Sequence, residues 1–261
     1  MTKILGCLAA LAALLSPCLR AADAAPKKLL VVDVVKTFRH SSIDTGEKVL
    51  AQLAAKSGAF TVDYCRNDDD MAKKMTPDAL KNYDGVFFLS TTGEMPFPDK
   101  TAFLDWIKSG KGFIGVHAAT DTCHGKGPGV DPYIEMIGAE FVGHTVAKVQ
   151  CINVDPEHPA TKGLGKTYEL TDEIYFMKNY DRTKVHELLI LDKAPGSNQP
   201  GFFPIAWCKN YGKGRVFYTA LGHFENVWES PEYQMHVLGG IKWALGLEKG
   251  DATPQHSAAN K

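Results

Sequence analysis

The sequence lacks a surplus of charge of either sign. Its 261 residues carry a formal net charge of −1, with 29 Lys and Arg against 30 Asp and Glu. A protein that binds nucleic acid or an anionic membrane through its electrostatic field needs a basic surface, so we expect neither partner. After residue 25 the sequence also lacks any apolar run long enough to cross a bilayer. We therefore predict no membrane span.

Cysteine is scarce as well. The whole chain has six, and those after residue 25 are Cys65, Cys123, Cys151 and Cys208. Their spacings match no zinc-binding motif. Buried free thiols and a disulfide formed in an oxidising compartment both remain open.

The N-terminus differs from the rest of the chain. Lys3 is followed by an almost wholly apolar stretch over residues 4–15, and mostly small residues fill 21–25. This order of charged, apolar and small residues is typical of a secretory signal peptide. We predict a signal peptide over 1–25, a single domain over 26–248 and a disordered polar tail over 249–261. The protein is then exported, to the periplasm or the extracellular space.

Strands and helices alternate along the first half of the chain. Apolar runs predict strands at 29–35, 60–65, 85–90 and 112–116, with helices at 43–56 and 99–108 between them. This alternation is typical of a doubly wound α/β fold with a mostly parallel sheet. The second half favours an antiparallel extension, with strands at 147–154 and 186–191, a hairpin at 204–208 and 215–220, and a last helix at 231–245.

The strand at 112–116 ends abruptly in small residues around His117. Gly115 before it, and Ala118 and Ala119 after it, leave room for a sharp turn from strand to helix. In α/β hydrolases a turn of this kind lifts a nucleophile above the sheet. The residue lifted here is a histidine, which binds metals or moves protons but is a poor acyl acceptor. A purely structural histidine at a strand end stays open.

Other polar loops are expected at the same edge of the sheet. Ligands of open α/β sheets bind beyond the carboxyl ends of the strands. The loop with Arg39 and His40, the segment 91–94 that ends in Glu94, and a later loop should therefore meet the His117 turn at one rim.

Six short motifs, taken together and in order, resemble the ThuA-like, or trehalose-utilisation, family. They are FRHSS at 38–42, STTGEM at 90–95, GVHAATDT at 115–122, GAEFVGHT at 138–145, DEIY at 172–175 and GRVFYTALGH at 214–223. The resemblance covers nearly all of the chain after the leader. It implies a flavodoxin-like core, related to the class I glutamine amidotransferases, under an antiparallel section. It also implies a role in disaccharide use or in the metabolism of 3-keto sugars.

Amidotransferase chemistry does not follow from the resemblance. Amidotransferases carry a nucleophilic cysteine at the sharp turn, where this sequence has His117, and Cys123 lies past the turn. The loop at 222–225 resembles the place where those enzymes carry their base. Because a base without its nucleophile cannot run acyl transfer, we exclude glutamine hydrolysis.

Three of the rim histidines form the predicted metal site. If His40, His117 and His223 all follow strands of one sheet, their imidazoles meet from three loops. Three imidazoles are a common site for zinc or another divalent metal, with an open position for water or substrate. We therefore predict a divalent metal cofactor, with zinc as one candidate.

The remaining rim residues are assigned to catalysis and substrate binding. His144, Asp121 and Glu94 are the predicted catalytic acid–base groups, although each can instead be a fourth ligand or orient a ligand histidine. A flat ring can stack on the apolar face of a sugar. The predicted substrate-binding residues are Arg39, Phe38, Tyr175 and Trp228.

These assignments predict a metal-assisted enzyme acting on oxidised (3-keto) glycosides or related carbohydrates, by lyase, hydrolase or isomerase chemistry. Two alternatives stay open: a carbohydrate-binding protein without turnover, and a metal-free hydrolase that uses carboxylates as acid and base. The expected partner is a small-molecule carbohydrate, and a homo-oligomer is compatible with the sequence.

Overall fold

One mixed β-sheet organises the molecule. The computed structural model describes residues 25–124, 129–197 and 199–256. Within these ranges nine strands form a single sheet in the order β2-β1-β3-β4-β9-β8-β7-β5-β6. The signal peptide predicted over 1–25 lies, apart from its last residue, outside the described residues. No helix of the described chain is long and apolar enough to cross a membrane.

Five strands form the parallel half of the sheet. They are β1 (Lys27–Val32), β2 (Phe60–Cys65), β3 (Gly85–Leu89), β4 (Gly112–Val116) and β9 (Gly214–Thr219). β1 lies between β2 and β3, β4 lies between β3 and β9, and all four pairings are parallel. Every residue of β3 and β4 is buried. Burial on both faces explains their continuous apolar sequences.

The antiparallel half continues from β9. It consists of β5 (Glu140–Asn153), β6 (Thr167–Lys178), β7 (His186–Lys193) and β8 (Pro200–Tyr211). β8 pairs antiparallel with β9 and with β7, and β5 pairs antiparallel with β7 and with β6. The prediction of an α/β protein with both kinds of pairing is confirmed. The DEIY segment lies inside the long strand β6.

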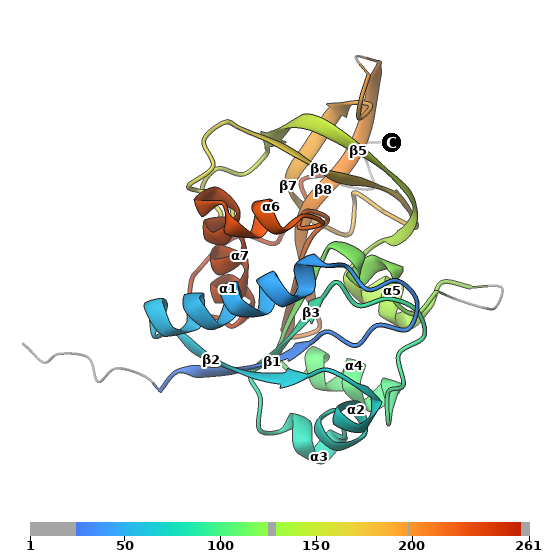
Figure 1. Ribbon diagram of the computed structural model, residues 1–261, viewed down its shortest axis with the longest axis vertical. Coiled ribbons are helices and arrows are strands. Elements are labelled where there is room, and N and C mark those ends of the chain that lie inside the picture. Colours follow the sequence, from blue (N-terminus) through green and yellow to red (C-terminus); the bar gives the residue numbers. More distant parts are fainter. Residues whose placement is uncertain (1–24, 125–128, 198, 257–261) are drawn as a thin grey trace, which may run out of the picture.

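Helices cover both faces of the parallel half (Figure 1). They are α1 (Ser42–Ser57), α2 (Asp68–Lys74), α3 (Pro77–Leu80), α4 (Lys100–Lys108), α5 (Pro132–Ile137), α6 (Glu225–Glu229) and α7 (Pro231–Ala244). Ile114 of β4 packs in the core formed with α1, α6 and α7. Its neighbour Phe113 belongs to the core on the side of α2 to α5, because successive strand residues point to opposite faces.

The four cysteines after the leader are free and buried. Burial raises the pKa of the Cys65 and Cys151 thiols to about 12 and raises that of Cys123. Since the thiolate is the reactive form, none of these three is a poised nucleophile. Of the two alternatives for these cysteines, the structure shows buried thiols.

The predicted disordered tail is folded as far as residue 256. The backbone N–H of Glu187 in β7 donates to Gln255 Oε1 over 2.7 Å, and Gln255 Nε2 donates back to the Glu187 carbonyl over 2.9 Å. His186 Nδ1 donates to the carbonyl of Thr253 over 2.7 Å. The tail therefore satisfies polar groups of β7 that the sequence alone does not reveal. Residues 257–261 lie outside the described part of the chain.

The glycines inside α7 mark a close approach between segments. A Cβ on Gly239 would lie 2.0 Å from the carbonyl oxygen of Pro159. We expect Gly239→Ala to lower the free energy of unfolding by about 2 kcal/mol, because overpacking outweighs the better helix propensity of alanine. Urea unfolding measures the change. Gly129→Ala, where an added Cβ meets nothing within 4 Å, is the control, and equal stability of both variants would contradict the expectation.

Candidate metal centre

His117 directly follows β4 at the predicted sharp turn. Its φ of 50° lies in the left-handed region, which residues other than glycine rarely adopt. The side chain is fully buried. Nδ1 lies 2.8 Å from the carbonyl oxygen of Ala220, and because a carbonyl only accepts, Nδ1 must be the donor. That bond fixes the tautomer and leaves the lone pair of Nε2 free to bind a metal.

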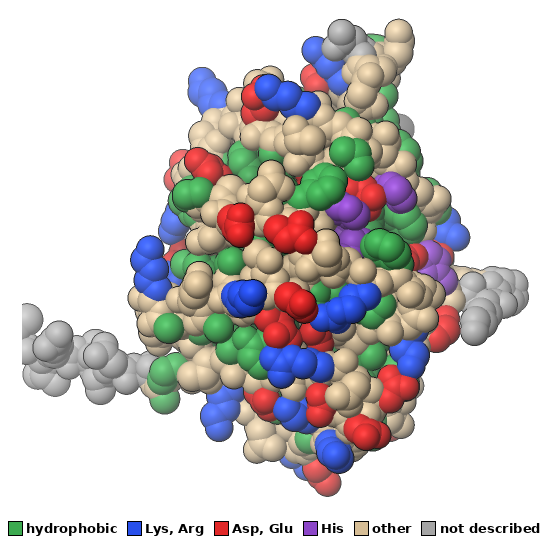
Figure 2. All heavy atoms as spheres, in the orientation of Figure 1, with side chains coloured by type: hydrophobic (Ala, Val, Ile, Leu, Met, Phe, Trp, Pro, Cys, Tyr) green, Lys and Arg blue, Asp and Glu red, His purple; other side chains and the backbone are tan. Residues whose placement is uncertain are grey.

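Two more histidines meet His117, each from a loop that follows a strand. His40 lies between β1 and α1, and His223 lies between β9 and α6. The ring centroid of His40 is 4.7 Å from that of His117 and 5.1 Å from that of His223. The His117 and His223 centroids are 5.2 Å apart. Figure 2 shows histidine side chains gathered on one face, beside acidic and hydrophobic ones.

Glu173 of β6 completes the cluster, although it was not among the site residues predicted from the sequence. One ligand atom from each of His40, His117, Glu173 and His223 can be chosen so that all lie within 4.8 Å of one another. His117 Nε2 is 3.2 Å from His223 Nδ1 and 3.4 Å from Glu173 Oε2, and His223 Nδ1 is 3.1 Å from the same oxygen. Tetrahedral ligands with bonds of about 2.1 Å lie about 3.4 Å apart. The three atoms thus match one face of a tetrahedral site.

His40, a member of this cluster, has an unsatisfied nitrogen. Its Nδ1 is buried and has no hydrogen-bond partner, which is unfavourable unless a ligand satisfies the atom. Burial, followed by the nearby charges of His117 and His223, lowers the pKa of His40 to about 3. The ring is therefore neutral at pH 7, and neutral imidazole is the form that binds a metal. The residues present fit a metal ion.

The pKa values of His223 and Glu173 are also shifted in the direction that favours metal binding. Burial, and then His117, lowers the pKa of His223. Burial alone would raise the pKa of Glu173, but the neighbouring imidazoles of His117, His223 and His144 together lower it. One ionised carboxylate beside imidazole nitrogens is a donor set typical of zinc.

The structure separates the three predicted catalytic residues. His144 Nδ1 lies 2.8 Å from Glu173 Oε1, with half of its side chain exposed, so it adjoins the cluster. Asp121 Oδ1 lies 2.6 Å from His124 Nε2, and burial raises its pKa while the charges of His124 and His117 oppose the rise. Glu94 is exposed. No hydrogen bond or ion pair joins it to the cluster within the described residues.

The predicted substrate-binding residues differ in their exposure to solvent. Phe38 is 62% exposed, with its ring edge-on to His40 at 4.9 Å. Arg39 is half exposed but donates to Asp44 over 2.8 Å. Tyr175 is buried beneath His117, with ring centroids 4.3 Å apart.

The assignment of Trp228 to substrate binding is wrong. Its side chain is fully buried in the core beside α1 and α7, and Nε1 donates to the carbonyl of Gly222 over 3.0 Å. It therefore supports the loop before His223 from inside, where no sugar reaches it. Glu173 was missed because no strand was predicted over residues 172–175, so the direction of its side chain could not be inferred.

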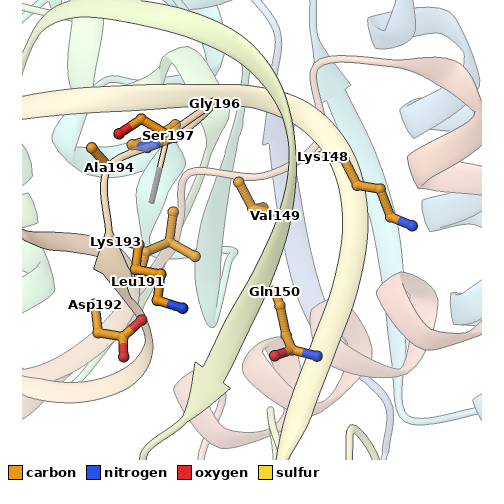
Figure 3. Close-up of a pocket in the computed structure, with 10 residues that line it drawn as sticks. Lys148, Val149, Gln150, Leu191, Asp192, Lys193, Ala194, Gly196 and Ser197 are labelled. Carbon is orange, nitrogen blue, oxygen red and sulfur yellow. The ribbon is translucent and has the colours of Figure 1, made fainter. Parts of the chain in front are cut away.

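A separate hollow of about 350 Å³ lies between β5 and the end of β7 with the turn that follows it (Figure 3). Figure 3 shows Lys148 and Gln150 on one side and Asp192 and Lys193 on the other. None of the described residues that line this hollow is a histidine or cysteine. It therefore offers none of the imidazole ligands found at the strand ends.

Comparisons with known proteins agree on fold and family. A family model described as "ThuA: Trehalose utilisation" matches residues 28–244. Solved structures of ThuA-like proteins from Bacteroides uniformis ATCC 8492 and Parabacteroides merdae ATCC 43184 are each 20% identical, with a TM-score of 0.68. They cover 90% and 89% of this chain, and 98% and 94% of their own.

More distant matches come from longer enzymes. A beta-galactosidase from Bacillus circulans sp. alkalophilus is 10% identical with a TM-score of 0.55, over 88% of this chain and 32% of its own. At such identities the likeness shows the fold alone. No protein of curated function matches the sequence.

Proposed function

Because the chain belongs to the ThuA, or trehalose-utilisation, family, which points to a carbohydrate-related function, we propose that it is a metal-dependent enzyme acting on oxidised (3-keto) glycosides. The proposed ligands are His40, His117, Glu173 and His223. The observation that carries the proposal is the spacing of 3.1 to 3.4 Å among three of their donor atoms. The proposal includes export and a parallel half of flavodoxin-like, doubly wound type.

A bound divalent metal supplies a Lewis acid that polarises a carbonyl or hydroxyl oxygen of the sugar. In a 3-keto glycoside the carbonyl acidifies the proton on C2. Removal of that proton to a base allows a C1=C2 bond to form while the C1–O bond breaks, and the aglycone leaves with a proton. This lyase step, and the related hydrolase and isomerase reactions, all need a base beside the carbonyl.

The residues around the cluster have separate roles in proton transfer, substrate contact and ligand positioning. His144 is held by Glu173 and half exposed, so its free nitrogen can carry protons between substrate and solvent. Phe38, edge-on to His40, offers an apolar surface to the substrate. Asp172 positions a ligand, because it accepts the backbone N–H groups of Gly222 over 2.7 Å and His223 over 3.2 Å.

Zinc titration after chelator treatment tests the proposal. We expect one zinc per chain, a higher thermal midpoint with zinc because the ligand binds only the folded state, and consumption of 3-keto glycosides only by the loaded protein. Glu173→Gln should weaken zinc binding by at least about tenfold. Glu169→Gln, on the same strand but paired with Lys148 at the surface, should leave it unchanged.

The same experiment separates the other functions. Turnover that survives chelation would indicate a metal-free hydrolase. Sugar binding without any product would indicate a carbohydrate-binding protein. Absence of zinc binding together with absence of a zinc-dependent midpoint would contradict the metal site itself.

A further inference from the structure

We infer that the substrate is an uncharged glycoside with an apolar, aromatic aglycone. The inference rests on the proposed function, since it assigns the substrate class of the same site. Its basis is an apolar rim around the metal cluster, which we define as Phe38, Val146 and Phe224.

The three rim residues come from three different elements. Phe38 lies edge-on to His40 at 4.9 Å, and Phe224 lies edge-on to His223 at 4.5 Å. Val146 of β5 is paired with Glu173 of β6. Side chains opposite each other in an antiparallel pair share a face, so Val146 lies on the face from which Glu173 reaches the cluster.

Nothing in the described chain covers Phe38 and Val146, whereas the third rim residue, Phe224, is half-buried against the core. Phe38 at 62% and Val146 at 54% are the two most exposed large apolar side chains of the described residues. Exposed apolar side chains scattered singly are ordinary, whereas a group around one site marks a place where something apolar binds. A sugar ring alone offers little apolar surface. An aromatic aglycone beside it would cover the rim.

The side chains around the site favour an uncharged substrate. No lysine or arginine of the described chain forms an ion pair or hydrogen bond with His40, His117, Glu173 or His223. Arg39 is the nearest arginine in sequence, and Asp44 and Asp33 hold its guanidinium at 2.8 and 3.9 Å. Apart from a bound metal, a sugar phosphate would thus find none of the lysine and arginine partners that phosphate sites commonly use.

Two glycosides that differ only in the aglycone test the inference. The 3-keto forms of benzyl and methyl glucoside release alcohols of similar acidity, so their leaving groups are chemically matched. With the zinc-loaded protein we expect kcat/KM to be about tenfold higher for the benzyl compound, as burial of one aromatic ring predicts. Calorimetry with the unoxidised glucosides should show the same preference in Kd. Glucose 6-phosphate should compete no better than glucose.

Variants assign any preference to the rim. The double variant Phe38→Ala/Val146→Thr should bring the benzyl-to-methyl ratio close to one while retaining zinc. The matched control Leu247→Ala/Val130→Thr removes exposed apolar groups elsewhere and should keep the ratio. Equal kcat/KM for both glycosides in a zinc-loaded, active protein would overturn the inference and leave the proposed function standing. Absence of zinc binding and turnover would overturn both.

A second copy of the chain is the competing occupant of the rim. Sedimentation of the wild type and the double variant distinguishes it. A dimer that the double variant dissociates would overturn the aglycone inference, whereas the same oligomeric state for both proteins supports it.

Discussion

Replacement of His117 by glutamine is expected to lower zinc affinity more than about 100-fold, which exceeds the usual loss when only a supporting residue is removed. Turnover should fall by about 1000-fold, because Lewis-acid stabilisation is worth several kcal/mol and each 1.36 kcal/mol is tenfold in rate. We expect this large effect because His117 Nε2 lies 3.2 Å from His223 Nδ1 and 3.4 Å from Glu173 Oε2. Metal analysis of the purified variant and a zinc-binding isotherm measure the first effect.

His236 provides the matched control. Like His117 it is fully buried, and its Nδ1 donates to a backbone carbonyl, that of Ala160, over 2.8 Å. Unlike His117 it belongs to no cluster of metal ligands among the described residues. His236→Gln and His117→Gln should therefore cost similar stability, while only His117→Gln loses zinc. Equal zinc affinity in the two variants would contradict the proposed site.

The three-histidine cluster could be anticipated because its logic is local. Each histidine follows a strand or precedes a helix, and parallel strands bring their carboxyl ends to one edge. Glu173 is different, since it reaches the cluster from β6, at the far end of the sheet order. Its position depends on the register that pairs Val146 with Glu173. A single sequence does not specify such a long-range register.

The aromatic assignments show the same limit. Phe38 and Trp228 were both predicted at the rim from their neighbours in sequence. The structure exposes Phe38 but buries Trp228 completely, because α6 turns its indole inward against the core of α1 and α7. Which face of a short helix is buried depends on the partner it packs against. The sequence of that helix does not identify the partner.

Asp33, directly after β1, is a buried carboxyl group outside the cluster. Its side chain is 1% exposed, and neither oxygen accepts a hydrogen bond from a donor group. Burial, and then the neighbouring carboxyl group of Glu47, raise its pKa to about 7, although Arg39 and Arg66 oppose the rise. Asp33 is therefore protonated when the solution is mildly acidic.

The direction of the pH effect follows from this pKa. In the unfolded chain Asp33 has the ordinary pKa of 3.8. Because the folded pKa is higher, the folded state keeps its proton longer, and the contribution to stability is complete below pH 3.8 and lost as the pH rises through 7. At pH 8 the loss amounts to about 4 kcal/mol, since each pKa unit is worth 1.36 kcal/mol.

Asp33→Asn should therefore stabilise the protein, and more so at alkaline pH. The amide keeps the shape of the carboxyl group and cannot ionise, so its advantage over the wild type should grow by about 2–3 kcal/mol between pH 5 and pH 8. Urea unfolding with chelator present measures this without linkage to metal binding. Asp44→Asn, which removes the other carboxylate that pairs with Arg39 but is 75% exposed, should change stability little at either pH. An advantage of Asp33→Asn that stays constant with pH would show that Asp33 titrates alike in the folded and unfolded chains.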